Sequence, residues 1–206
     1  MRKITGSLFQ SLDGVIQAPG GPEEDQTGFR HGGWTFPYFD DSLDGPMNRL
    51  LGGDYELLLG RRTYEIFAAY WPHADTTDNP IAQKLNALPK YVASTTLDSL
   101  EWENSQLIGG DVADAVGKLK EQPGDELQVH GSGALATYLI DHGLVDEYRL
   151  LTFPVYLGTG KKLFADGVRP GALRLLSSST TSTGVVVSNY AAAGAPSYGT
   201  YGLDQQ

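Results

Sequence analysis

The feature that most constrains the fold is a repeated alternation of short apolar segments with segments of helical periodicity. Residues 55–60, YELLLG, predict a buried strand, and directly after them Tyr64, Phe67 and Trp71 stand at helical spacing. Residues 127–144 repeat this order as a strand, a glycine turn and a helix. Strands joined by helices through short connections run parallel and lie between two helical layers. The sequence therefore predicts an α/β fold whose mostly parallel sheet is covered by helices on both faces.

Three segments depart from this alternation. Residues 17–33 hold five glycines and two prolines and predict a long loop, of the kind that serves as a lid or stays disordered. Residues 172–193 predict two strands joined by a short polar turn, a hairpin that supplies antiparallel strands at the edge of the sheet. Residues 194–206 are low in aliphatics and predict a loose tail. We therefore expect a single domain over residues 1–193, which suits a chain of 206 residues of which 40% are hydrophobic.

The composition argues against several classes of function. The chain has 25 acidic and 15 basic residues, and its net charge of −10 repels nucleic acids and anionic membrane surfaces. It has no cysteine, which excludes disulfides and thiolate ligands and suits a cytoplasmic protein. No apolar run has the length of a membrane span, and the first residues lack the apolar core of a signal peptide. His31, His73 and His142 do not have metal-ligand spacing, so we expect no metal site.

Two adjacent arginines, Arg61 and Arg62, fall in the first turn of the helix that follows residues 55–60. A helix amino terminus carries partial positive charge, so each cation there is opposed by about 0.3–1 kcal/mol. Free backbone N–H groups and two guanidiniums together suit a phosphate, and this is the functional interpretation. The alternative is that Arg61 pairs with Glu65 one turn later and that Arg62 points into water. The sequence leaves both interpretations open.

The segment VHGSGALA, 129–136, has the form G-x-G-x-x-A between a strand and a helix. Such a turn lets backbone approach a pyrophosphate, although glycine turns here also occur for purely steric reasons. A site for NAD also needs an acid after the next strand to bind the ribose, but that strand ends in Thr152 and Phe153. If the ligand is a dinucleotide, the arginine pair is the natural site for the 2′-phosphate of NADP.

The order of these motifs resembles the dihydrofolate reductase-like family, and most of all the branch similar to the reductase domain of the bifunctional riboflavin-biosynthesis enzyme. Over about residues 2–192 the motifs are SLDGVIQ, a glycine- and proline-rich loop, WTFPYFDD, LLLGRRTYE, YVASTT, VHGSGAL and LVDEYRLLTFPVYLGTGKKLF. The resemblance implies a three-layer fold with about eight strands, NADPH as the hydride donor, a small-molecule substrate and a homodimer. It also implies that residues 17–33 form a mobile lid.

By the same resemblance, four groups of residues bind the cofactor: a phosphate-binding turn, the end of the next strand beside the adenosine, a pyrophosphate turn with the residue before it, and a wall under the nicotinamide. In that order they are Gly60, Arg61, Arg62 and Thr63; Ser94 and Thr95; His130, Gly131, Ser132, Gly133, Ala134 and Leu135; and Val15 and Ile16. His130 is placed close to the nicotinamide, or it is simply a satisfied histidine of the sheet.

The chain departs from true dihydrofolate reductases at their folate-binding carboxylate. When Trp34 and Pro37 are aligned with the family's tryptophan and proline, Phe39 takes the place of that acid, and Asp40 and Asp41 follow it. The pterin ring needs a buried carboxylate, so this argues against folate. No deaminase motif with zinc-ligating histidine and cysteines stands in front, so we expect the reductase part alone.

Candidates on the substrate side are fewer and each has a structural alternative. Trp34 and Phe39 suit a flat heterocycle, although such aromatics are more often core. Asp13, Asp40 and Thr152 are the candidate catalytic groups. Each also has a structural role that its position predicts: Asp13 in a turn, Asp40 at a helix cap or in solvent, and Thr152 as an ordinary strand residue.

Together these features predict an NADPH-dependent reductase of a small pyrimidine-like, pterin-like or carbonyl-bearing substrate. One alternative is dihydrofolate reductase itself. Another is a non-catalytic, NADP-binding dimer that acts as a scaffold or sensor.

Overall fold

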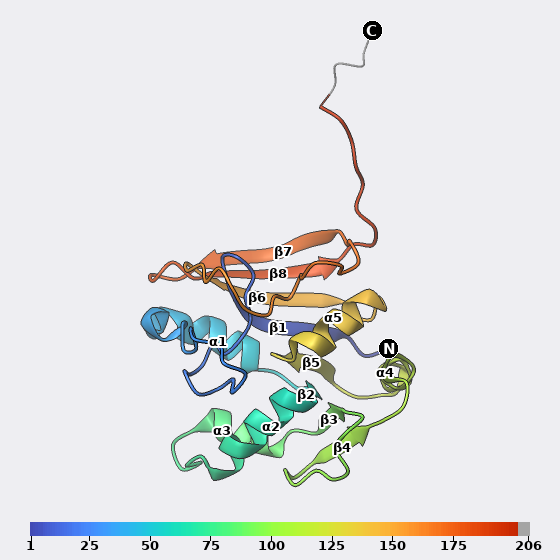
Figure 1. The fold of residues 1–206 in the computed structure, drawn as a ribbon. Coiled ribbons are helices and arrows are strands. Elements are labelled where there is room, and N and C mark those ends of the chain that lie inside the picture. Colours follow the sequence, from blue (N-terminus) through green and yellow to red (C-terminus); the bar gives the residue numbers. More distant parts are fainter. Residues whose placement is uncertain (202–206) are drawn as a thin grey trace.

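The computed structural model describes residues 1–201 and contains one eight-stranded sheet in the order β4-β3-β2-β5-β1-β6-β8-β7 (Figure 1). Strands β1 to β6 run parallel to one another, whereas β8 runs antiparallel to both β6 and β7. The strands are β1 Ile4–Ser11, β2 Tyr55–Gly60, β3 Lys90–Ala93, β4 Ser105–Ile108, β5 Glu126–His130, β6 Glu147–Phe153, β7 Leu173–Thr180 and β8 Val186–Ala192. The predicted sheet and its terminal hairpin are confirmed.

Helices connect the parallel strands and form a layer on each face of the sheet (Figure 1). They are α1 Asp44–Leu51, α2 Arg61–Tyr70, α3 Pro80–Ala87, α4 Val112–Glu121 and α5 Gly133–Asp141, with 3₁₀ turns η1 Phe36–Tyr38, η2 Asp41–Leu43 and η3 Trp71–His73. The expected strand at 55–60 has the observed bounds of β2, whereas α3 and β4 were not expected.

Strand β2 shows why the fold has three layers. Leu57, Leu58 and Leu59 are all fully buried. Leu57 and Leu59 pack in the cluster that holds residues of α2 and α3, while Leu58 packs with residues of α4 and α5 on the opposite face. Because strand side chains alternate between faces, consecutive buried leucines require cover on both. Each buried leucine contributes roughly 1.5–3 kcal/mol to folding.

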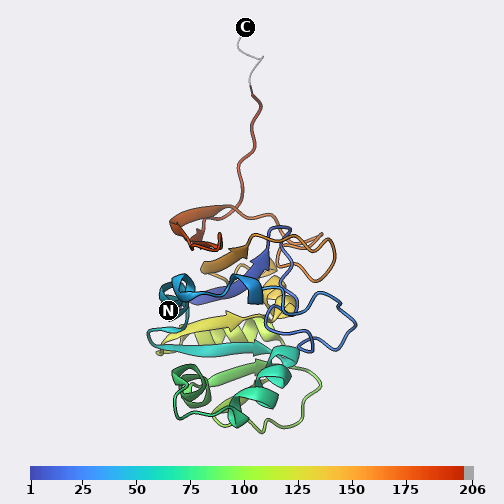
Figure 2. The ribbon, with the colours of Figure 1, turned by 90° about the vertical axis from the view of Figure 1, so that its left-hand side faces the viewer.

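The loop at 17–33 follows β1 and stands beyond the carboxyl ends of the central strands (Figure 2). It is tied to the rest of the chain at several points. Trp34 Nε1 donates a hydrogen bond of 2.8 Å to the carbonyl of Gln17. Lys161 forms an ion pair of 2.9 Å with Asp25, and its backbone N–H donates to Gln17 Oε1 at 3.0 Å. The loop thus has a defined path along residues 159–162.

After β8 the chain leaves the sheet, and the predicted tail begins at residue 194 (Figure 1). Gly194 still accepts a hydrogen bond from the backbone of Ala172, while Tyr198 is fully exposed beyond it. Residues 202–206 of the predicted tail lie outside the described residues.

We predict that Gly160→Ala destabilises the fold more than Gly158→Ala. Both glycines have positive φ, +124° and +73°, which strains other residues by about 1–2 kcal/mol. A Cβ at Gly160 would also lie 2.6 Å from Val15 Cγ1 and 2.9 Å from Phe29 Cε2, whereas one at Gly158 meets nothing within 4 Å. We expect losses of about 2–4 kcal/mol for Gly160→Ala and about 1 kcal/mol for Gly158→Ala in urea unfolding. Equal losses would mean that the contact with Val15 relaxes freely.

Candidate functional site

The predicted cofactor residues come together along the carboxyl-terminal edge of four neighbouring strands, β3, β2, β5 and β1. Ser94 follows β3, Gly60 ends β2, Gly131 follows β5, and Val15 follows β1. Carboxyl ends of parallel strands lie at one edge, which is where open α/β sheets bind ligands. The predicted cofactor residues at the ends of these four strands therefore lie along one edge of the sheet, and we call this set of residues the strip.

Two hydrogen bonds join the glycine turn to the start of α2. The backbone N–H of Gly60 donates to Ser132 Oγ at 2.9 Å, and the backbone N–H of Ser132 donates to Thr63 Oγ1 at 2.9 Å. Ser132 adopts the left-handed conformation with φ 45° and ψ 47°, and Gly131 before it has φ 56°. This conformation turns both the side chain and the N–H of Ser132 toward α2. The amino termini of α2 and α5 are thereby held side by side.

The turn also packs closely against the segment that follows β1. A Cβ on Gly133 would lie 2.8 Å from Ile16 Cδ1, and one on Gly60 would lie 3.5 Å from Leu135 Cβ. Val15 and Ile16 are both buried, and the N–H of Ile16 donates to the carbonyl of Lys161 at 2.9 Å. Glycine at 133 is therefore what lets the predicted nicotinamide wall touch the predicted pyrophosphate turn.

Both helix amino termini at this strip are suited to an anion. Helix α2 has Gly60 as its N-cap and α5 has Ser132, and neither end has a side-chain cap or an acid in its first turn. The first N–H groups of a helix have no acceptor within the helix, and its dipole is positive there. Ala134 lies in this first turn of α5. Two uncapped amino termini side by side make a positive cradle of backbone donors.

The two arginines differ in their contacts: Arg61 has the ion pair of the structural interpretation, and Arg62 has none within residues 1–201. Arg61 Nη1 forms an ion pair of 2.9 Å with Glu65, and the two side chains are 41% and 45% exposed. This is the surface ion pair that the alternative, non-functional interpretation predicted. Arg62 is exposed and forms no ion pair within residues 1–201. Arg62 is thus available to a ligand. Arg61 could bind the same ligand only by breaking its ion pair with Glu65 or by contacting both.

Ser94 and Thr95 extend the strip beside the arginines, because Ala93 at the end of β3 pairs with Gly60. Ser94 is buried, and its Oγ accepts hydrogen bonds of 3.1 Å from the backbone of Thr96 and of Leu97. Thr95 is exposed at the surface of the turn. Thr95 is therefore open to a ligand, while Ser94 shapes the backbone around it.

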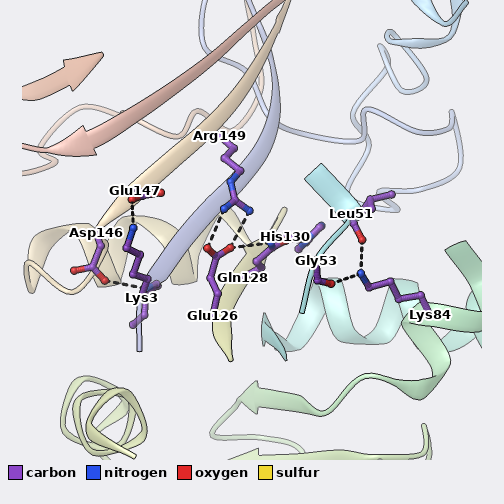
Figure 3. A network of polar contacts seen from close by, with 11 residues as sticks. Lys3, Leu51, Gly53, Lys84, Glu126, Gln128, His130, Asp146, Glu147 and Arg149 are labelled. Carbon is purple, nitrogen blue, oxygen red and sulfur yellow. Dashed lines mark hydrogen bonds and ion pairs between the residues drawn. The ribbon is translucent and has the colours of Figure 1, made fainter. Parts of the chain in front are cut away.

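His130 ends β5 (Figure 3) and directly precedes the glycine turn. It is only 9% exposed. Its ring stacks on Tyr55 with centroids 5.9 Å apart and an angle of 20° between planes, and Nε2 lies 2.9 Å from Gln128 Oε1. Burial, and after it the positive charge of Arg149, lowers the pKa of His130 to about 4. His130 is therefore neutral at pH 7.

The predicted substrate aromatics lie on the face of the sheet that α1 covers. Trp34 is buried in the core there and packs edge-on against Phe153 at 5.5 Å. Phe39 stacks on Phe153 at 6.2 Å and remains 46% exposed. Trp34 therefore serves the core and holds the loop, whereas Phe39 offers a free ring face.

Within residues 1–201, no hydrogen bond joins the three candidate catalytic groups to one another, and each has other partners. Asp13 accepts from Ser11 Oγ at 2.6 Å and from the backbone N–H of residues 157 and 158, and Asp40 caps η2 and accepts from Ser182 Oγ at 2.6 Å. Thr152 Oγ1 accepts from Gln10 Nε2 at 3.0 Å, and strand alternation puts it on the opposite face of β6 from Phe153. In each case the contacts are those of the structural alternative.

Two cavities lie away from the glycine turn. One of about 490 Å³ lies at the amino-terminal end of β5 and is lined by residues that include Arg49, Gly53, Glu126 and Arg149. The other, of about 460 Å³, lies between the loop 17–33 and residues 159–161. Within residues 1–201 no three His, Cys, Asp or Glu side chains cluster as metal ligands. No helix in that range has the length and apolar character of a membrane span.

Fold and edge together define a dihydrofolate reductase-like α/β protein. A dihydrofolate reductase of Enterococcus faecalis, solved with NADP(H) and RAB-propyl, superposes with a TM-score of 0.57 at 12% identity, over 92% of this chain and 96% of that one. The model of the RibD C-terminal domain matches residues 2–187, and the chain belongs to that family. The resemblance and the fold class inferred from the sequence are confirmed.

Other similar proteins agree with this assignment. The uncharacterized protein YyaP of Bacillus subtilis is 29% identical over 90% of this chain and 92% of its own length. A putative riboflavin biosynthesis protein from Shewanella sp. PV-4 has a TM-score of 0.64 at 20% identity, over 93% and 99% of the two chains. A pyrimidine reductase-like protein from Corynebacterium diphtheriae has a TM-score of 0.59 at 13% identity, over 93% and 92%.

Two groups of residues at the site had not been singled out from the sequence. Gln17, Asp25 and Lys161 anchor the loop, and Glu126 and Gln128 hold His130. Glu126 and Gln128 carry a signal, since with His130 they occupy alternate positions of a strand that is otherwise apolar. Gln17, Asp25 and Lys161 have no such signal in the sequence, because Lys161 is far from the other two along the chain and all three are residue types common on protein surfaces.

We predict that Asp13→Asn lowers the free energy of unfolding at pH 7 by about 1 kcal/mol, because the amide keeps only one acceptor oxygen for three donors. The hydrogen bond from Ser11 is the main cause that lowers the pKa of Asp13 from 3.8 to about 2. A lowered pKa stabilises the fold above the unfolded value, and this contribution is lost as pH falls through the folded value. The difference between the two proteins should therefore shrink between about pH 4 and pH 2 in thermal unfolding. A difference that is constant over that range would contradict this assignment.

Proposed function

We propose that the protein is an NADPH-dependent reductase that transfers a hydride to a small pyrimidine-like, pterin-like or carbonyl-bearing molecule. The observation that carries the proposal is the junction at Ser132, which holds two uncapped helix amino termini beside Arg61 and Arg62. Membership of the RibD C-terminal domain family and the names of the similar structures support the reductase class.

The residues present fit such a cofactor. The 2′-phosphate would bind at Arg62 and the start of α2, the adenosine beside Thr95, and the pyrophosphate at the N–H groups of residues 133–135. Val15 and Ile16 would support the nicotinamide ring, which supplies the hydride when the cofactor is bound. Because Gly131 and Gly133 lack side chains, the pyrophosphate can approach the backbone closely.

The protein's own part in the reaction is mainly positioning. The loop 17–33, fixed by Asp25 and Lys161, would exclude water from the reacting atoms. His130 is neutral at pH 7 and is unsuited to deliver a proton there, because the lowered pKa leaves its second nitrogen unprotonated. Since Asp13 and Asp40 are occupied by structural hydrogen bonds, we infer that water brings the proton.

Two other functions remain alternatives with their own tests. Dihydrofolate reductase activity would need a buried acid where this chain has Phe39. The next residue, Asp40, is exposed and caps η2. A non-catalytic NADP-binding scaffold would bind the cofactor at the same residues but would catalyse no reaction. NADPH oxidation with dihydrofolate supports the first alternative. Tight NADPH binding without turnover on a panel of pyrimidines, pterins and carbonyl compounds supports the second.

We predict that the protein prefers NADPH to NADH and that Arg62→Ala removes most of this preference. A charge-assisted contact to phosphate contributes about 1.5–3 kcal/mol, so NADPH affinity should fall about tenfold to a hundredfold while NADH affinity changes little. Arg61→Ala should show the same direction with a smaller effect, because Glu65 already holds that side chain. Fluorescence titration with both nucleotides measures the two dissociation constants.

Lys118→Ala is the matched control for this experiment. Lys118 belongs to an exposed i,i+4 ion pair with Asp114, so its removal changes net charge and helix surface as Arg61→Ala does, but on α4. Its NADPH affinity should be that of the parent protein. Equal losses of NADPH and NADH in Arg62→Ala would remove the arginine argument.

We further propose a homodimer that forms through the edge strand β7. All eight residues of β7 are exposed, including Leu173, Leu175 and Leu176 at 38%, 51% and 44%. A long exposed edge strand with leucines is unfavourable in a lone subunit, and pairing with a second copy would cover it.

We predict that Leu175→Lys yields a monomer in light scattering and sedimentation, because a charge is costly in an apolar interface. Leu107→Lys is the control, since Leu107 is 37% exposed on β4 at the opposite edge of the sheet. That variant should keep the mass of the parent protein. A parent protein that is itself monomeric would end this proposal without affecting the cofactor site.

A further inference from the structure

A chain of four polar side chains runs along the sheet toward the glycine turn (Figure 3). At its start, two nitrogens of Arg149 bind the two carboxylate oxygens of Glu126 at 2.8 and 2.9 Å. Gln128 Nε2 then donates to Glu126 Oε1 at 2.8 Å, and Gln128 Oε1 lies 2.9 Å from His130 Nε2. Glu126, Gln128 and His130 alternate along β5, so their side chains share one face of the sheet.

The direction of every hydrogen bond in this chain follows from which atoms can donate. Glu126, bound by a guanidinium, is a carboxylate and can only accept. The amide nitrogen of Gln128 must therefore face Glu126, and its amide oxygen faces His130. Because that oxygen has no proton to give, His130 Nε2 must carry the hydrogen. The ring of His130 is thus fixed in the Nε2–H tautomer.

The other ring nitrogen, Nδ1, is left with an unshared lone pair. Arg149 and the buried Tyr55 and Gln128 surround the ring, and no group within residues 1–201 donates to Nδ1. Ser7 is the register neighbour of His130 on β1, but its Oγ has no partner either. His130 as a whole is 9% exposed, and Nδ1 is not among the buried polar atoms that lack a partner. It lies one residue before the glycine turn.

We propose that the chain Arg149–Glu126–Gln128 makes His130 a fixed hydrogen-bond acceptor, and that Nδ1 receives an N–H of the bound ligand. The identity of that ligand rests on the function proposed above: the donor is either the carboxamide of the nicotinamide or an N–H of a heterocyclic substrate. A carbonyl oxygen finds no donor at this atom. Arg149, Glu126 and Gln128 are positioning residues, since they act only through His130.

The tautomer can be measured directly, without any ligand, by long-range proton–nitrogen NMR. The chain has four histidines, and His130→Gln identifies the signals of His130 by their loss. His142 is an internal reference of opposite kind, because its Nδ1 lies 2.8 Å from the carbonyl of Tyr138 and must donate to it. We expect His130 protonated at Nε2 alone and His142 protonated at Nδ1. A His130 that is protonated at Nδ1, or at both nitrogens at pH 7, would overturn the proposal.

Two variants test whether the chain causes this state. Gln128→Met keeps a similar volume and removes the acceptor, so His130 should populate both tautomers. Glu126→Gln lets Gln128 turn either way, because an amide at 126 can donate or accept, and the same mixture is expected. Glu126 is less buried than Gln128, so this variant decides the matter if Gln128→Met does not fold. Unchanged tautomers in Glu126→Gln would mean that the chain does not control His130.

Titration with NADPH tests the ligand part. A donor at Nδ1 shifts its nitrogen signal, and the acetylpyridine analogue of NADPH, which lacks the carboxamide N–H, should not produce the shift if the nicotinamide is the donor. If only an aminouracil added to the NADPH complex produces it, the donor belongs to the substrate. No shift with any of these probes, although NADPH binds, overturns this inference and leaves the proposed function intact. Failure of NADPH to bind while the tautomer is as expected overturns the proposed function instead.

Discussion

The two hydrogen bonds of Ser132, one accepted from Gly60 and one donated to Thr63, are the contacts on which the candidate site depends. They cross from the turn after β5 to the end of β2 and the start of α2, and Gly131 and Ser132 both have positive φ in this turn. Without them the start of α5 would be an ordinary strand-to-helix connection, and α2 an ordinary helix with two misplaced cations. With them, two helix amino termini lie side by side, and the two arginines belong to the first turn of one of these helices. The acidic surface of the chain does not oppose this, because donors within hydrogen-bond reach outweigh screened charges farther away.

The order of the strands explains why segments distant in the sequence meet at this point. Strand β5 lies between β1 and β2, so the loops after all three emerge side by side. Close packing then limits what the loops can be. Gly133 leaves room for Ile16, and Gly160 leaves room for Val15. The wall, the turn and the loop beyond it are therefore one packed unit, and a side chain added at either glycine displaces the others.

Much of the fold could be predicted from the sequence because its strong signals are local. The strand at 55–60 is a run of apolar residues, and it has the predicted bounds. The missed elements lacked such a signal: β4 is a four-residue edge strand with two exposed residues, and α3 has only eight residues, too few to establish a helical period in the sequence. At the candidate site, the order of the motifs predicted which residues the structure brings together at the ends of β3, β2, β5 and β1, and their binding of a cofactor stays a prediction. The hydrogen bonds that occupy Asp13, Asp40 and Arg61 could not, because their partners are set by tertiary contact.

The start of α2 carries full positive charges, whereas the ring of His130 is neutral, and this difference follows from how deeply each is buried. At the start of α2, Arg62 is exposed and Arg61 is partly exposed, so full charges persist there at little desolvation cost and suit a phosphate. His130 lies within the sheet, where burial and Arg149 disfavour a second proton on the ring. A neutral ring there can accept an N–H of a ligand and reject a carbonyl, without adding charge beside the hydride that the proposed reaction would transfer. Glu126 makes this possible, since it balances the charge of Arg149 and at the same time orients the amide that holds the ring.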